Sequence, residues 1–70
     1  MCESKAYLAT AEGEQLVLED VASIREENEG YRLTNLFGEQ IHLRCRIRDI
    51  DLMKHRIVFE PVREGTPNGT

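Results

Sequence analysis

Apolar and polar residues alternate with a period of two along most of this chain, most clearly in residues 39–50. Four apolar and four basic side chains alternate there: Ile41, His42, Leu43, Arg44, Cys45, Arg46, Ile47 and Arg48. A period of two places successive side chains on opposite faces of a strand. The segment is therefore predicted to be a half-buried strand with one face in solvent. The alternation breaks towards Ile50, which indicates a bend or bulge near residues 48–50.

The rest of the chain predicts further short strands separated by turns. Strands are expected over 5–10, 15–19, 21–25, 31–35 and 56–60, with turns at 12–14, 26–30, 36–39 and 51–55. Short strands with turn signals about every 8–12 residues are typical of a small all-β domain, and closure into a barrel removes exposed edges. We predict an all-β fold, a small SH3-like barrel of five to six short antiparallel strands. An incomplete barrel would leave an edge for a second subunit.

The chain is short enough to need a source of stability besides its hydrophobic core. Its 70 residues predict a single small β-barrel domain over 1–62 and a flexible C-terminal tail over 63–70. Domains of this size bury only about 60% of their unfolded surface and often need a disulfide, a metal or a partner subunit. A disulfide is not expected from two cysteines in a chain without a signal peptide or membrane span. We therefore predict a cytoplasmic protein with reduced thiols, stabilised by a metal, an oligomer or both.

Most residues with reactive side chains have a structural interpretation. Cys45 shares its strand face with apolar neighbours, so it is predicted to be a core residue. His42 and His55 form no local pair with the spacing of a structural zinc site. No nucleophile and base occur in a recognisable arrangement, so the chain is predicted not to be an enzyme.

A basic face suggests an alternative function. It consists of Arg44, Arg46, Arg48 and Arg56. Small barrels bind single-stranded nucleic acid through a basic groove combined with stacking aromatic residues. Here no aromatic residue interleaves with the arginines, the net charge is −4, and Glu39, Asp49 and Asp51 are close in sequence. An ion-paired solvent face is therefore favoured over nucleic-acid binding.

Cys2 directly follows Met1, and no apolar pattern accounts for it. Removal of Met1 would leave an α-amine, a thiolate and a backbone amide on adjacent atoms. Such nitrogen and sulfur donors in a plane suit Ni(II) or Cu(II). The alternative is a chance cysteine at an unconstrained terminus. The residues alone leave both interpretations open.

Four stretches of the chain resemble a known family. They are the Met-Cys start in 1–8, the Leu-Val-Leu-Glu-Asp-Val segment in 15–21, the Leu-Phe-Gly-Glu turn at 36–39 and the Ile-Asp-Leu-Met loop and strand at 50–58. Their order and spacing resemble the CooT family of small nickel-binding proteins, which are accessory to carbon monoxide dehydrogenase maturation. The likeness covers about residues 1–60.

The resemblance implies a metallochaperone that supplies nickel to an enzyme such as carbon monoxide dehydrogenase. It implies an SH3-like homodimer that binds about one Ni(II) per dimer between its subunits, with Cys2 as the metal ligand. Whether the nitrogen donor is the α-amine or a backbone amide stays open. Residues 61–70 contain no His or Cys, so the second nickel site of some relatives is not expected here.

Overall fold

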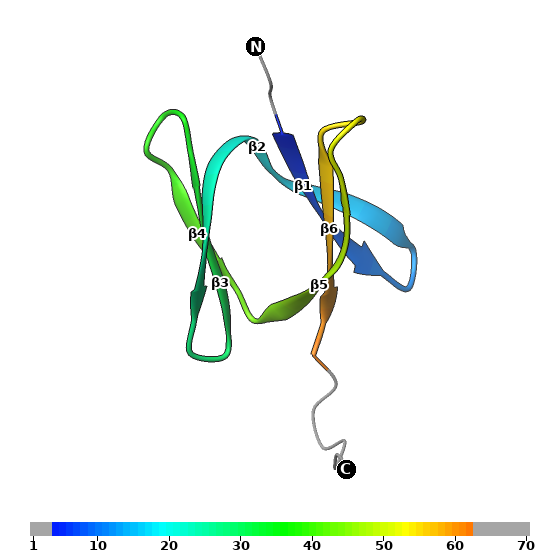
Figure 1. The fold of residues 1–70 in the computed structure, drawn as a ribbon. Helices are drawn as coiled ribbons and strands as arrows, with labels where there is room; N and C mark the ends of the chain where they lie inside the picture. The colour runs from blue at the N-terminus through cyan, green and yellow to red at the C-terminus, as the bar shows by residue number, and fades with distance from the viewer. Residues whose placement is uncertain (1–3, 63–70) are drawn as a thin grey trace.

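A computed structural model describes residues 4–62, which form six strands in one curled sheet (Figure 1). The strands are β1 Ser4–Thr10, β2 Gly13–Glu27, β3 Gly30–Asn35, β4 Gln40–Leu43, β5 Cys45–Asp51 and β6 Arg56–Pro61. Their order across the sheet is β4-β3-β2-β1-β6-β5. The predicted all-β, barrel-like fold is confirmed, with the sheet curled into a half-barrel. No helix within residues 4–62 is long and apolar enough to cross a membrane.

The strands predicted over 15–19 and 21–25 are one long strand, β2. Asp20 does not end it but bends it, with a φ of 56°. Asp tolerates this left-handed backbone conformation better than most residues. The first half of β2 pairs with β1 and the second half pairs with β3, so the bend lets one strand serve both parts of the curled sheet.

The long strand predicted over 39–50 is instead two strands, β4 and β5, separated at Arg44. The chain changes partners there, because β4 pairs with β3 whereas β5 pairs with β6. The predicted irregularity is confirmed, since the register of β5 shifts between Ile47 and Asp49. Alternation continues across Arg44, so the side-chain pattern alone gives no sign of the change of partner.

The first and last strands, β1 and β6, lie side by side and run parallel, with Lys5 opposite Arg56. This pair departs from the predicted antiparallel arrangement, whereas the other strand pairings in residues 4–62 are antiparallel. Parallel pairing brings the starts of both strands to the same end of the barrel. The Lys5 N–H donates to the His55 carbonyl there at 2.9 Å.

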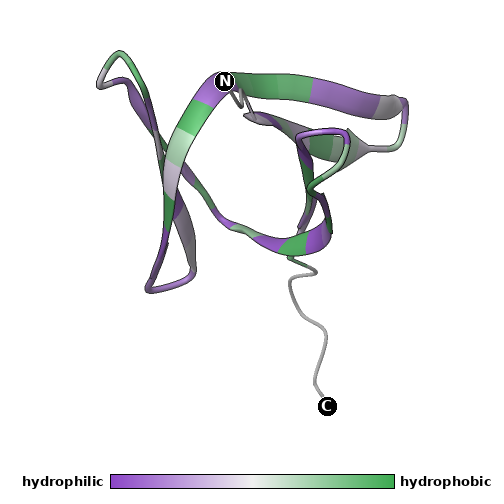
Figure 2. Cartoon of the chain, turned by 45° about the horizontal axis from the view of Figure 1, so that its top comes forward, coloured by the Kyte–Doolittle hydropathy of each residue, from purple (hydrophilic) through white to green (hydrophobic). Residues whose placement is uncertain are grey.

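The core lies inside the curl and draws on five of the six strands. Its buried cluster consists of Ala6, Leu18, Leu33, Cys45, Ile57 and Phe59. Phe59 and Leu33 are its largest fully buried side chains, and the Tyr31 ring packs tilted against Phe59 with centroids 5.9 Å apart. Figure 2 shows the hydrophilic and hydrophobic residues alternating along the strands. The prediction that Cys45 is a core residue is confirmed.

Candidate functional site

The structure describes the chain from Ser4 onward, so the predicted ligand Cys2 lies outside the described residues. The surroundings of Ser4 nevertheless define one end of the barrel. Ser4 lies opposite Val21 in the β1–β2 ladder, next to the bend of β2. The neighbouring Lys5 is bonded to His55 at the end of the β5–β6 turn. The start of β1 is therefore held between the β2 bend and that turn.

The β3–β4 turn, residues 36–39, is fixed at the same end by Asn35. The Asn35 side-chain oxygen accepts hydrogen bonds from the backbone N–H groups of Phe37 at 3.0 Å and Glu39 at 2.8 Å. Its amide nitrogen donates to the Glu39 carboxylate at 2.7 Å, and the Leu36 N–H donates to the Asp20 carbonyl at 2.9 Å. The side chain of Asn35 is buried and satisfied, so the turn is rigidly attached to the bend of β2.

Sequence reasoning placed the turn correctly but missed Asn35 as the residue that organises it. Asn is a turn former because its short amide can hydrogen-bond the backbone two residues ahead. An Asn at the end of a predicted strand, directly before a Leu-Phe-Gly turn, is the signal that would have indicated this role.

The β5–β6 turn, residues 52–55, is fixed in a similar way. The Lys54 N–H donates to an Asp51 side-chain oxygen at 3.0 Å, and His55 has a positive φ of 57°. Leu52 and Met53 project from the turn with 78% and 89% of their surfaces exposed. The turn is thus an ordered loop that presents two large apolar side chains to solvent.

The two turns together present large exposed apolar residues around the start of β1. We call this set the apolar rim: Leu36, Phe37, Leu52 and Met53. In the β3–β4 turn, 62% of Leu36 and 76% of Phe37 are exposed. Figure 1 shows both turns at the end of the molecule where β1 begins. Exposed large apolar side chains at the same end of a molecule are candidates for an interaction site.

Within residues 4–62, no group of three or more His, Cys, Asp or Glu side chains is placed to hold a metal ion. Cys45 is buried in the core, and burial raises the pKa of its thiol. His42 lies on the outer face of β4, with Nε2 3.9 Å from a carboxylate oxygen of Glu27. Arg32 donates to the other oxygen at 2.9 Å and holds the pKa of that carboxyl below its ordinary value. His42 thus lies beside the surface ion pair of Arg32 and Glu27.

A family model described as CO dehydrogenase accessory protein CooT matches residues 1–60 of this chain. This chain belongs to the CooT family. The match spans Cys2, the bend of β2 and both turns of the apolar rim. By its description the family is accessory to an enzyme. This agrees with the sequence analysis, which found no recognisable arrangement of catalytic residues.

Two individual proteins are similar to this CooT-family chain. An uncharacterized protein from Methanothermobacter thermautotrophicus is 40% identical over 60 residues, which cover 86% of this chain and 89% of that protein. The crystal structure of a protein assigned as CooT from Carboxydothermus hydrogenoformans matches with a TM-score of 0.81 and 32% sequence identity. That match covers 89% of this chain and all of the other.

Three arginines of the basic face of this CooT-family chain are ion-paired, as predicted, but with acids other than those near them in sequence. Arg44 lies 3.6 Å from Glu29, Arg46 lies 3.0 Å from Glu60, and Arg56 contacts Glu14. The predicted partners Glu39 and Asp51 instead bind Asn35 and the backbone of Lys54. Arg48 lines a surface hollow with the third predicted acid, Asp49, and with Glu14 and Arg56. The partners come from β2, β6 and the β2–β3 turn, distant in sequence from the arginines, so local sequence does not reveal them.

Proposed function

We propose that this protein is a nickel metallochaperone that binds Ni(II) through Cys2 at the interface of a homodimer. It delivers the ion to a nickel enzyme such as carbon monoxide dehydrogenase and does not itself catalyse a reaction. The observation that carries the proposal is the apolar rim around the start of β1, in a chain that belongs to the CooT family.

The chemistry of the ligand supports Ni(II) as the cargo. One Cys2 offers a thiolate and a nitrogen, either its α-amine or a backbone amide. Two copies related by a two-fold axis offer two thiolates and two nitrogens, a donor set that suits a square-planar Ni(II) ion. Since residues 4–62 contain no cluster of metal-binding side chains, a second copy is the natural source of the remaining donors. The expected stoichiometry is about one Ni(II) per dimer.

The position of the apolar rim supports the dimer. Two peptide units separate Cys2 from Ser4, so the chain can carry its Cα no more than about 7 Å from that of Ser4. Ser4 lies between the two turns that bear the apolar rim. Burial of the apolar rim against a second copy would remove large apolar side chains from water. The same contact would bring both Cys2 residues to one interface.

The thiol ligand also constrains where the protein works. A thiolate binds Ni(II) only while it is reduced, and thiols stay reduced in the cytoplasm. We therefore place the protein there. Because the thiol and nitrogen must lose protons before they bind metal, the nickel affinity should fall as the pH is lowered.

The proposal is tested by titrating Ni(II) into the protein and its Cys2→Ser variant under reducing conditions. We expect thiolate-to-nickel charge-transfer absorption that saturates near one metal per two chains and is lost in Cys2→Ser. Cys45→Ala is the matched control, because its thiol is buried in the core, and it should titrate like the wild type. An unchanged titration in Cys2→Ser would exclude Cys2 as the ligand.

A further inference from the structure

The first half of β2 has an open edge. Residues 13–21 pair with β1 on one side, whereas the pairing with β3 on the other side begins only at Val21. Within residues 4–62, no strand lies beside Gly13–Glu19 on the side away from β1. In an antiparallel strand, alternate residues direct their N–H and C=O groups towards opposite neighbours. This edge therefore offers unpaired backbone groups to an incoming strand.

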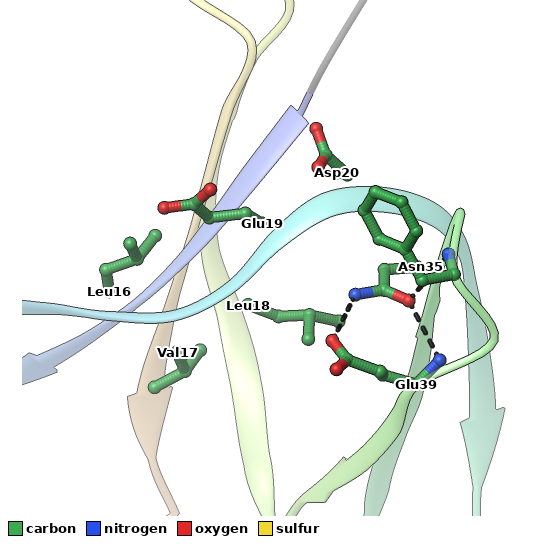
Figure 3. A pocket seen from close by; sticks show the side chains of 8 residues that line it. Leu16, Val17, Leu18, Glu19, Asp20, Asn35 and Glu39 are labelled. Atoms are coloured by element: carbon green, nitrogen blue, oxygen red, sulfur yellow. Dashed lines mark hydrogen bonds between the residues drawn. The ribbon is translucent and has the colours of Figure 1, made fainter.

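A hollow of about 430 Å³ lies next to this edge (Figure 3). Leu16, Val17 and Leu18 of β2 line one side of it, and Phe37 contributes to the side formed by the β3–β4 turn. Leu16 is 42% exposed and Phe37 is 76% exposed. The hydrogen bonds from Asn35 hold this turn in place. The open edge is thus accompanied by a preformed apolar surface.

The charge around the hollow is negative. Among residues 4–62, three carboxylates line it, those of Glu19, Asp20 and Glu39, and no Lys or Arg does. Glu39 accepts a hydrogen bond from the neutral Asn35 amide, which leaves its negative charge uncompensated by that contact. An occupant that carries Lys or Arg beside apolar residues complements both the charge and the apolar surface.

A second copy of this chain complements this edge poorly. Residues 13–21 of a second copy carry Glu14, Glu19 and Asp20 and no Lys or Arg, so pairing two β2 edges would gather like charges along the new ladder. Like charges directly opposite each other across two strands are destabilising. The occupant favoured by charge is therefore a segment of a different protein.

We propose that the open edge of β2 binds an extended basic and apolar segment of a partner protein by strand addition. Backbone hydrogen bonds to the edge supply much of the affinity in this mode, and side-chain contacts supply specificity. Leu16 and Phe37 contact the apolar residues of the segment, while Glu19 and Asp20 pair with its Lys or Arg residues. None of the described lining residues is a proposed nickel ligand, but Phe37 also belongs to the apolar rim, so a bound segment and a second copy of the chain would compete for this side chain.

The proposal is tested by isothermal titration calorimetry with a defined peptide, acetyl-Lys-Val-Lys-Phe-Lys-Val-Lys-amide. A second peptide replaces each Lys by Glu, and a third carries N-methyl groups on alternate backbone amides, which blocks strand pairing without changing charge. Saturable binding of the first peptide alone supports the proposal. If the N-methylated peptide binds as tightly as the first peptide, the binding is general charge attraction and the strand-addition proposal is overturned. The proposal is also overturned if the first peptide does not bind.

Variants locate the binding site. Glu19→Lys should weaken binding of the first peptide about tenfold or more, since a pair of opposite charges becomes a pair of like charges. Glu12→Lys makes the same charge change in the β1–β2 turn, outside the residues that line the hollow, and should leave the affinity near that of the wild type. Leu16→Gln, which keeps the charge, should also weaken binding. Equal effects of Glu19→Lys and Glu12→Lys would overturn the location.

Discussion

At the scale of single residues, burial separates the chemistry of Cys45 from that of an exposed thiol. Cys45 belongs to the core cluster with Leu33 and Phe59, and desolvation of its thiolate raises the pKa of the thiol. Only the thiolate is an effective nucleophile and metal ligand. Cys45 therefore contributes packing, and the alternation of residues 41–47 was sufficient to predict this.

Cys45 should react slowly with a thiol reagent in the folded protein. In the Cys2→Ser variant, where Cys45 is the single thiol, we expect slow reaction with Ellman's reagent near neutral pH and rapid reaction in concentrated urea. Burial raises the pKa of the Cys45 thiol in the folded protein. The neutral thiol therefore stabilises the fold at pH values below the pKa of the unfolded state. This stabilisation is lost as the pH rises through the pKa of the folded state. Fast native reaction at neutral pH would contradict the burial.

At the scale of elements, the sequence predicted where strands occur better than which strands pair. Each predicted strand except 39–50 lies within one observed strand, because alternation and turn residues are local signals. The prediction was wrong in making 39–50 one strand and in ending a strand at Asp20, whereas the structure divides the chain at Arg44 and continues β2 through Asp20. Both depend on a change of partner strand. Partner choice is decided by contacts distant in sequence, which a local pattern does not contain.

Gly30 shows how one residue permits the change of partner at Arg44. Its φ is +148°, and an added Cβ would collide with the Leu43 carbonyl oxygen and lie 3.0 Å from the Arg44 Cα. The absence of a side chain thus lets the start of β3 approach the end of β4 closely. Glycine is suited to such close approaches of two backbone segments.

Gly30→Ala should destabilise the fold strongly. The unfavourable backbone conformation alone costs about 1–3 kcal/mol, and the collision with backbone atoms adds to that. Gly13→Ala is the matched control, since Gly13 has a φ of +120° but no atom within 4 Å of an added Cβ. Urea unfolding should therefore show a larger loss of unfolding free energy for Gly30→Ala. Equal losses would mean that the backbone relaxes away from the collision.

At the scale of the whole molecule, the candidate site is assembled at one end of the barrel from distant parts of the chain. The start of β1, the bend of β2 and two turns meet there through backbone bonds from Lys5 to His55 and from Leu36 to Asp20. Sequence reasoning named Cys2 and both turns. It did not predict that the turns flank the first strand, because that depends on the parallel pairing of β1 with β6 and on the β2 bend.

This arrangement predicts that the apolar rim controls both dimerisation and nickel affinity. The double variant Leu36→Ser with Leu52→Ser removes two exposed leucines, one from each turn, and neither leucine carries a metal donor. Burial of a leucine side chain contributes about 1.5–3 kcal/mol, so the dimer dissociation constant should rise at least about tenfold. Nickel affinity should fall with it, because a site shared by two chains is linked to their association. Sedimentation equilibrium and the Ni(II) titration measure the two effects.

The matched control for this double variant is Val62→Ser. Val62 is also exposed, at 46%, but it follows β6 at the end of the barrel opposite the start of β1 (Figure 1). It should leave both dimerisation and nickel binding unchanged. The folds of the two variants should be equally stable, since the leucines lie outside the buried core.

A dimer that is insensitive to the leucine substitutions would place the interface elsewhere. Loss of dimerisation with unchanged nickel affinity would show that a single chain completes the metal site.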